Sequence, residues 1–306
     1  MAKRTLCKKV GSLTPEDKWF MIPCMLPDLE QIQARYQEPS GQTDKVAAAR
    51  YLLKFAGPLF PVRTRVFEAV NRYCRILDDL VDESPSVAPV REVILTERKG
   101  LLSDRPHTEL QKQYLDPVLT ALGEDQGKAL NRHMFRLFGG FLVDLDVKKE
   151  QRPLSAAQLK TRNFLHCWSA VAAFSLIWSG IQPIPVRDSV SLMNAWGSYD
   201  NLADLQEDLT HGLILVSREE VDNFNLQFKD GENLPADQLR GYYQRKRRII
   251  SVELNRCSGS VFKVGLPAWL AFCYFAYFQT RRLKLLGPLV MDDGAKFPAS
   301  RDVRTL

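Results

Sequence analysis

Apolar residues recur at helical spacing over long stretches of the chain. The clearest stretches are residues 59–83, 128–148, 155–180 and 189–208, followed by 237–255 and 263–286. Residues three and four positions apart lie on one face of a helix, so this spacing predicts helices with one buried face. The alternation that is typical of strands is nearly absent. The pattern predicts a single all-α domain over residues 1–306, with about eight to ten helices and peripheral ends at 1–25 and 290–306.

Two apolar stretches require a test for membrane spans. Residues 163–186 contain no Asp, Glu, Lys or Arg, but they include serines, a histidine and two prolines. Residues 266–278 are too short to cross a bilayer, which needs about 20 apolar residues. We therefore expect both stretches to be buried helices of a soluble protein.

Composition and charge narrow the classes of partner. The net charge of +6 fits an anionic ligand or an anionic membrane surface, and no basic stripe on a known module predicts a nucleic-acid partner. The six cysteines include no CxxC pair, which disfavours a zinc site and a disulfide framework. The basic N-terminus is followed by no apolar segment of a secretory signal, so we expect a cytoplasmic protein with reduced thiols.

The basic run QRKRRII at residues 244–250 has two readings. We expect it to be the solvated face of a helix, because exposed charge is normal on protein surfaces. Peripheral contact with an anionic membrane is the alternative, since basic clusters are attracted to acidic lipids.

The segment CRILDDLVDE, residues 74–83, combines acidic residues with an apolar helical pattern. Asp78 and Asp82 lie four positions apart and therefore share one helix face, where like charges repel. Two such carboxylates facing a cavity are suited to a hard divalent cation such as magnesium. A solvated acidic surface is the simpler interpretation of this motif taken alone.

A second acidic segment, YDNLADLQEDLTHG at residues 199–212, strengthens the metal interpretation. Asp200, Asp204 and Asp208 follow one another at four-residue intervals, with Glu207 beside them. Two acidic helix faces that meet across a bundle can hold magnesium ions. Such ions can bind a diphosphate and neutralise its charge as it leaves carbon.

These motifs resemble those of the squalene/phytoene synthase family of all-α isoprenoid synthases. YCRILDDLVDE resembles the family's CRxxDDxxD motif, and the preceding LFPVRTRVFEAVNRYCR follows LPxxxRxAxxAxYxxCR. NLADLQEDLTHG is similar to the second motif, LRDxxEDxxxG, and GGFLVDL at 139–145 is similar to an intervening GMxxDL segment. The resemblance covers roughly residues 50–225 and implies an isoprenoid-synthase helical bundle around a central apolar cavity.

The resemblance also implies roles for individual residues. The implied magnesium-binding residues are Asp78, Asp79, Asp82, Asp204, Glu207 and Asp208. Among these, Asp78, Asp82, Asp204 and Asp208 match the catalytic aspartates, while Asp79 and Glu207 match additional ligands or neighbours. Arg75 matches a diphosphate-contacting arginine, although a salt bridge within the helix is the alternative, and Arg50 matches a basic residue of the N-terminal helix. We expect Phe164 and Trp168 to line the substrate cavity.

The further cavity candidates are Phe138, Phe141, Phe174, Trp178, Trp196 and Tyr199. Aromatic faces stabilise cations, although large apolar residues also fill ordinary cores. His166 is expected in the core or at the edge of the cavity.

The chain departs from the family pattern at several positions. TRNFLHCWSAVAAF at residues 161–174 lacks the tyrosine of the family's YxxxVAG helix. Leu213 and Leu215 stand where the family has arginine and tyrosine, and Ala203 replaces another arginine. These changes affect parts linked to the later steps of head-to-head condensation.

The resemblance implies a magnesium-dependent enzyme that ionises a prenyl diphosphate, with C15 or C20 chains expected, and condenses two of them head to head. The alternatives are a terpene cyclase that uses one prenyl diphosphate and a non-catalytic assembly or binding relative. A reductive step with NADPH is compatible with the family, but no motif here supports it. The sequence leaves the product and the oligomeric state open.

Overall fold

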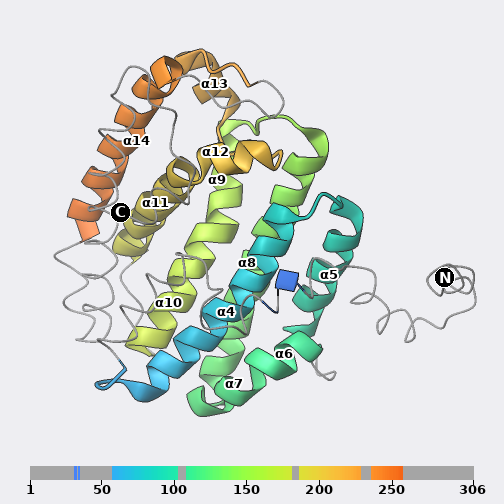
Figure 1. Ribbon diagram of the computed structural model, residues 1–306. Helices are drawn as coiled ribbons and strands as arrows, with labels where there is room; N and C mark the ends of the chain where they lie inside the picture. The colour runs from blue at the N-terminus through green and yellow to red at the C-terminus, as the bar shows by residue number, and fades with distance from the viewer. Residues whose placement is uncertain are drawn as a thin grey trace, which may run out of the picture.

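The computed structural model describes residues 31–32, 34, 57–102, 108–180, 186–228 and 236–257. Within these ranges the protein is helical and contains no strand, only an isolated bridge between Leu154 and Ser217. The all-α prediction is therefore confirmed. Figure 1 shows α4, α8 and α10 running through the middle of the molecule, with α11 and α14 packed along one another beside them.

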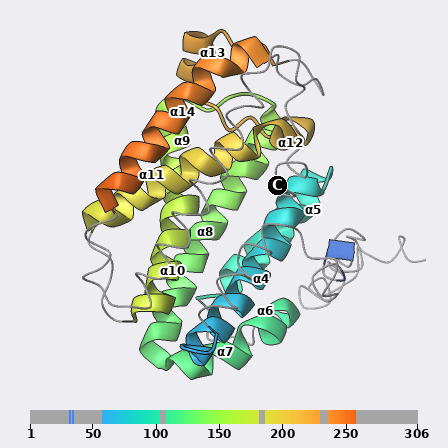
Figure 2. The same ribbon diagram turned by 60° about the vertical axis from the view of Figure 1, so that its left-hand side comes forward.

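Within the described ranges, short connections join successive helices. They are α4 (Pro61–Glu83), α5 (Val87–Gly100), α6 (Glu109–Tyr114), α7 (Asp116–Leu122), α8 (Glu124–Glu150), α9 (Ala156–Asn163), the π-helical turn η2 (Phe164–Trp168), α10 (Ser169–Ser179), α11 (Val186–Ala203), α12 (Leu205–Thr210), α13 (Arg218–Phe224) and α14 (Ala236–Cys257). Figure 2 shows α9, η2 and α10 as one continuous rod beside α8.

Local sequence explains where several helices begin and end. Pro61 stands at the start of α4, where its missing N–H costs nothing. Ser155 begins α9 through a capping box with Gln158. The 27-residue helix α8 ends at Gln151, which takes the left-handed conformation at φ 52°.

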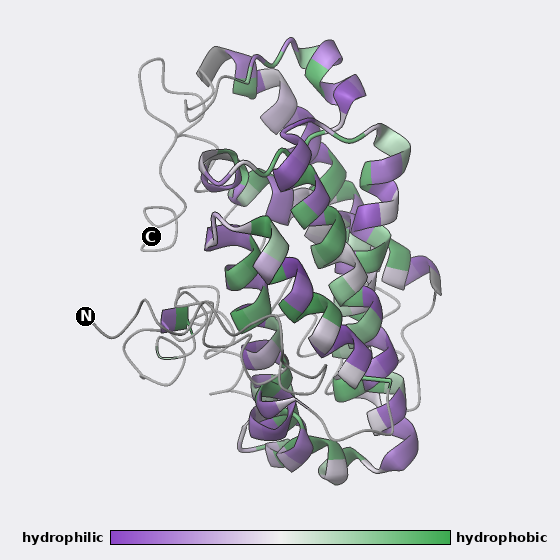
Figure 3. Ribbon diagram, turned by 90° about the vertical axis from the view of Figure 1, so that its right-hand side faces the viewer, coloured by the Kyte–Doolittle hydropathy of each residue, from purple (hydrophilic) through white to green (hydrophobic). Residues whose placement is uncertain are grey.

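One core lies between α4, α5, α8 and α10. The apolar residues interleaved with the first acidic motif belong to it, because Ile76, Leu77 and Leu80 have no exposed surface. Phe138 and Trp178 are also fully buried there. In Figure 3 the green, apolar parts of the helices gather toward the middle of the bundle, as the periodicity predicts.

A second core joins α11 and α12 to α14 through four fully buried side chains: Leu202, Leu205, Leu239 and Tyr242. Tyr199 belongs to this second core, so it packs between helices. The two cores meet where α11 approaches α10 and η2.

The predicted helical stretches agree with the structure except in two places, and the described residues form the eleven α-helices α4 to α14 where about eight to ten were expected. The stretch 155–180 forms α9, η2 and α10 with a π-helical turn in the middle, and the stretch 189–208 is interrupted at Asp204. The stretch 263–286 lies outside the described residues. In the part of the chain that the structure describes, no helix is long and apolar enough to cross a membrane.

The basic run 244–250 lies on α14. Arg245, Arg247 and Arg248 are exposed, as expected for a solvated face. Lys246 is buried instead, and its ammonium lies 2.8 Å from a carboxylate oxygen of Glu220.

Candidate active site

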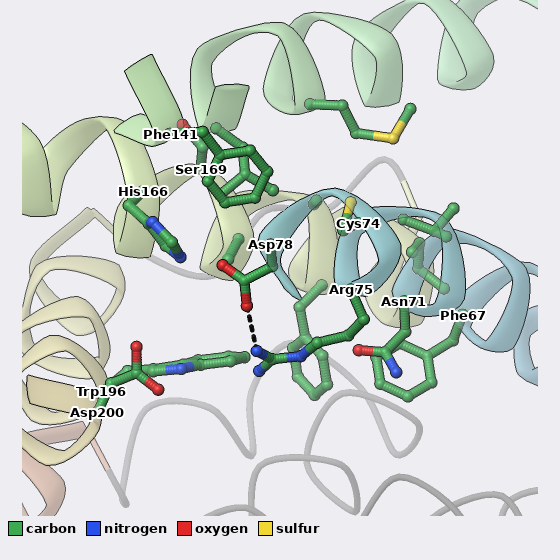
Figure 4. Close-up of a pocket in the computed structure, with 17 residues that line it drawn as sticks. Phe67, Asn71, Cys74, Arg75, Asp78, Phe141, His166, Ser169, Trp196 and Asp200 are labelled. Carbon is green, nitrogen blue, oxygen red and sulfur yellow. Dashed lines mark hydrogen bonds and ion pairs between the residues drawn. The ribbon is translucent and has the colours of Figure 1, made fainter. Parts of the chain in front are cut away.

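A pocket lies where α4, α8, η2, α10 and α11 meet (Figure 4). Its charged or titratable lining residues are Cys74, Arg75, Asp78, His166 and Asp200. Aromatic side chains make up much of the remaining wall: Phe67, Phe141, Phe174 and Trp196. The pocket therefore combines a small polar group with a largely apolar surface, which is common in ligand-binding sites.

Arg75 and Asp78 form an ion pair on the pocket side of α4. Arg75 Nη1 donates a hydrogen bond to Asp78 Oδ2 across three residues of the helix. Their side chains are 20% and 13% exposed, so both groups are accessible from the pocket. The salt bridge that the sequence left as an alternative role of Arg75 is present, and Arg75 also lines the pocket.

The first acidic motif divides between two environments. Asp78 lines the pocket, whereas Asp79 is 9% exposed and belongs to the buried face of α4. Asp82 is partly buried near the end of the helix and does not line the pocket. Of the three aspartates implied as magnesium ligands in this motif, Asp78 is the one at the pocket.

The second acidic motif bends at its middle residue. Asp204 follows the last residue of α11 with φ −99° and ψ 1° and is the N-cap of α12. The backbone still joins Asp204 N to Asp200 O at 3.0 Å and Asp208 N to Asp204 O at 2.8 Å, so the three residues stay one turn apart. Asp200 lines the pocket, while Asp204 and Asp208 are each 8% exposed and do not.

Carboxylates from α4 and α11 therefore reach the same region. Burial raises the pKa of the Cys167 thiol to about 12, and nearby charges that include Asp200 and Asp78 contribute to this shift. Asp200, which the resemblance did not select, is therefore a better candidate for a pocket carboxylate than Asp204 or Asp208. In the sequence, Asp200 could have been identified as the first of three aspartates at four-residue intervals.

The described residues do not form a preassembled metal centre. Within the described ranges, no three His, Cys, Asp or Glu side chains are arranged to hold a metal ion. Asp78 from α4 and Asp200 from α11 supply two carboxylates to the pocket. Magnesium typically binds through one or two carboxylates together with waters and substrate phosphates, and this donor set fits that mode.

A buried lysine near the end of α8 binds the end of α4, next to the first acidic motif. Lys148 Nζ donates hydrogen bonds to the carbonyl oxygens of Val81 at 3.0 Å, Asp82 at 2.8 Å and Ser84 at 2.7 Å. Burial lowers the pKa of Lys148, and the nearby Asp82 and Glu83 carboxylates oppose that shift. Lys148 thus stabilises the end of α4, and sequence reasoning missed it because its partners lie more than 60 residues away.

A buried ion pair joins α8 to α9. Arg162 donates from Nε and Nη2 to the two carboxylate oxygens of Asp144, each at 2.7 Å, and Arg162 Nη1 lies 3.4 Å from Asn201 Oδ1. Burial alone would raise the pKa of Asp144, but Arg162 and His166 hold it at about 2. Sequence reasoning saw the GGFLVDL segment that contains Asp144 but assigned it no partner.

The π-helical turn η2 brings His166 to the wall of the pocket. The imidazole Nδ1 lies 3.6 Å from Asp144 Oδ2, and the ring packs edge-on against Phe141 with centroids 5.2 Å apart. An added methyl group on Gly140 would lie 2.9 Å from His166 Cβ, so this glycine permits the close approach of α8 and η2. His166 occupies the cavity edge that the sequence indicated.

Two of the predicted substrate-binding residues lie elsewhere. Phe164 is 46% exposed and stacks on Trp168 at a centroid distance of 5.1 Å, and neither residue lines the pocket. Phe141, Phe174 and Trp196 do line it, as predicted. Arg50 lies outside the described residues.

The comparison with known proteins provides no relative. No protein-family model matches the chain, and no curated protein matches it. The functional interpretation therefore depends on the residues of the chain and the geometry of the pocket.

Proposed function

We propose that the protein is a magnesium-dependent isoprenoid synthase that ionises a prenyl diphosphate. One observation carries this proposal. Asp78 and Arg75 from α4 and Asp200 from α11 face a pocket whose remaining wall is mainly aromatic and aliphatic. A prenyl diphosphate combines a negatively charged head with an apolar chain, which are the two kinds of group that this lining suits.

The polar end of the pocket suits the diphosphate. Asp78 and Asp200 would hold magnesium, which when bound neutralises negative charge that develops on the leaving diphosphate. Arg75 would exchange part of its pairing with Asp78 for phosphate oxygens, since a guanidinium presents several donors in a planar fork. Both changes lower the free energy of the transition state for ionisation.

The aromatic wall suits the hydrocarbon cation that ionisation creates. Phe67, Phe141, Phe174 and Trp196 line the pocket from four helices or turns. Aromatic faces attract cations and exclude water, which would otherwise capture the cation. The acidic and aromatic parts of the pocket therefore support successive stages of one reaction.

Condensation of two prenyl diphosphates is the preferred outcome, because the motif context around Asp78 follows the two-substrate pattern. A cyclase that uses one chain is favoured by a different observation. Leu213 and Leu215, at the altered positions, are 1% and 4% exposed and pack as core residues. They supply neither a charge nor a hydroxyl for a second diphosphate. Retention of the aspartates argues against a purely non-catalytic binding protein.

The direct test is diphosphate release. The purified full-length chain is incubated with magnesium and C10, C15 or C20 prenyl diphosphates, singly and in pairs, and products are identified by mass spectrometry. We expect release in magnesium and its loss in chelator. The matched control is the Asp78→Asn/Asp200→Asn double variant. Full release in chelator, or no release from any substrate, would contradict the proposal.

A further inference from the structure

We propose that His166 is the proton acceptor that ends the carbocation reaction in this pocket. This inference depends on the proposed function, because it assigns a role in the step that follows ionisation. It is based on the position of the imidazole, its contact with Asp144 and the chemistry of the other groups in the pocket wall.

The local fold directs His166 into the pocket. A π-helical turn interrupts the rod of α9 and α10 at Phe164–Trp168, and such turns often occur at functional sites because they reorient side chains. Gly140 has no side chain to obstruct the approach of this turn to α8. In Figure 4 the imidazole of His166 enters the pocket from η2, near Phe141 and on the side where Asp78 enters from α4.

The buried carboxylate of Asp144 acts on the imidazole through its charge. Asp144 Oδ2 lies 3.6 Å from His166 Nδ1, and Arg162 keeps the carboxylate ionised. A negative charge on that side favours the tautomer that carries its proton on Nδ1. The lone pair of Nε2 is then available to the pocket. Asp144 is accordingly a positioning residue.

The other polar groups of the pocket are poorly suited to accept the proton. Burial raises the pKa of the Cys74 thiol to about 12, so the thiol stays protonated and is a poor acceptor. Asp78 and Asp200 are the groups that would hold magnesium, and Ser169 and Asn71 carry a weakly basic hydroxyl and amide. Among the described lining residues, the imidazole of His166 is therefore the group best suited to accept a proton.

The step balances without an additional reagent. The bond to the diphosphate breaks first, and the leaving group takes the electron pair. His166 Nε2 then takes a proton from a carbon near the cationic centre, and the C–H electron pair forms a new C–C bond. Loss from the adjacent carbon gives a double bond, and loss from the next carbon gives a cyclopropane ring. The imidazolium passes its proton to the released diphosphate or to water.

The experiment compares His166→Gln and His166→Phe with His133→Gln. Gln retains polarity and Phe retains the ring that packs on Phe141, so the two variants guard against a failure to fold. His133 lies outside the pocket lining and controls for the loss of an imidazole. Diphosphate release and the ratio of deprotonated hydrocarbon to water-captured alcohol are measured separately.

We expect both His166 variants to release diphosphate within about tenfold of the wild-type rate, while the hydrocarbon-to-alcohol ratio falls at least about tenfold, in line with the loss of a general base. His133→Gln should keep the wild-type ratio. An unchanged ratio in the His166 variants, or diphosphate release reduced by more than about a hundredfold, would overturn the inference and leave the proposed function intact. Absence of release by the wild type would instead remove the proposed function.

Discussion

The ion pair between Arg75 and Asp78 is weak enough for either partner to bind another group instead. Both side chains are partly exposed, and pairs of this kind contribute only about 0–1 kcal/mol to folding. Their value lies in geometry, because the pair orients a carboxylate and a guanidinium toward the same pocket. In the proposed reaction, a magnesium–diphosphate complex would replace this ion pair at low cost, since each partner would gain a stronger interaction.

Asparagine at either pocket aspartate should impair turnover. Asp78→Asn and Asp200→Asn each remove a charged ligand without changing side-chain size, and we expect a loss of at least about a hundredfold in kcat. Steady-state kinetics in magnesium measures this change. Asp204→Asn is the comparison, because Asp204 belongs to the motif but does not line the pocket. A loss confined to Asp204→Asn would favour the motif assignment over the observed geometry.

Removal of the Asp144 charge should destabilise the protein. Asp144→Asn leaves Arg162 as a buried charge with a weaker partner, and we expect a loss of about 3–5 kcal/mol in unfolding free energy. Chemical denaturation provides the measurement. Asp146→Asn is the matched control on the same helix, because Asp146 and its partner Arg91 are 52% and 39% exposed. Equal effects of the two substitutions would show that the buried pair has no special role.

The same charge makes stability depend on pH in a defined direction. The pKa of Asp144 is about 2 in the folded protein, below the value of about 3.9 for an unfolded chain. Its contribution is therefore present above pH 4 and is lost as the pH falls through 2, because the unfolded state then binds the proton more readily. The difference between wild type and Asp144→Asn should shrink as the pH is lowered from about 5 to about 3.

At the scale of elements, neighbouring glycines of α8 should respond in opposite ways. In Gly140→Ala the new methyl group would lie 2.9 Å from His166 Cβ and 3.1 Å from its backbone nitrogen, so η2 must move. We expect a loss of about 1–3 kcal/mol. In Gly139→Ala the nearest atom is 3.6 Å away, and a gain of about 0.5–1 kcal/mol is expected from the more rigid chain.

Thermal denaturation of the two alanine variants measures this difference. Gly140→Ala should also alter the product ratio, because it displaces His166. Equal stability of the two variants would show that α8 and η2 can separate without cost.

The end of α4 should depend on a lysine from α8. Lys148→Met retains the aliphatic stem but leaves three carbonyl groups without their donor, and we expect a loss of about 2 kcal/mol. Lys149→Met is the control, because Lys149 is exposed on the same helix. Urea unfolding measures the free energy of unfolding of the two variants. The interpretation fails if the exposed lysine contributes as much as the buried one.

At the scale of the whole molecule, sequence periodicity predicts contacts within an element much better than contacts between elements. The spacing of Ile76, Leu77 and Leu80 was enough to predict α4 and its buried face, since one face of a helix is encoded locally. The backbone hydrogen bonds between residues four positions apart continue across the break at Asp204. Apolar residues on both sides of the break therefore keep their helical spacing, and the sequence does not reveal the break.

Contacts between helices also explain why some predicted pocket residues lie outside the pocket and why Asp144, Arg162 and Asp200 were not assigned from the sequence. A π-helical turn holds one more residue than an α-turn, which rotates Phe164 and Trp168 relative to a regular helix. The pairing of Asp144 with Arg162 joins two helices, and no local spacing encodes it. The acidic motifs predicted that α4 and α11 reach one pocket, while the choice of Asp200 required the packing of α11 against η2 and α10.

At the scale of the whole molecule, the rate law and the carbon number of the product distinguish condensation from cyclisation. Condensation needs two prenyl chains bound together, so at low substrate the rate should rise with the square of concentration, and the product should contain the carbons of two substrates. Cyclisation needs one chain, which gives a first-order rate and an unchanged carbon number. Initial rates of diphosphate release, measured beside product masses, distinguish them.

We expect the second-order result, because LFPVRTRVFEAV before Asp78 follows the two-substrate pattern. The opposing observation is the burial of Leu213 and Leu215, at the positions where arginine and tyrosine are missing. Leu213→Arg is not a useful rescue, because it would bury a charge in the core. A first-order rate with unchanged carbon number would replace condensation by cyclisation, and Asp78 and Asp200 would keep the same role, since both reactions begin with loss of diphosphate.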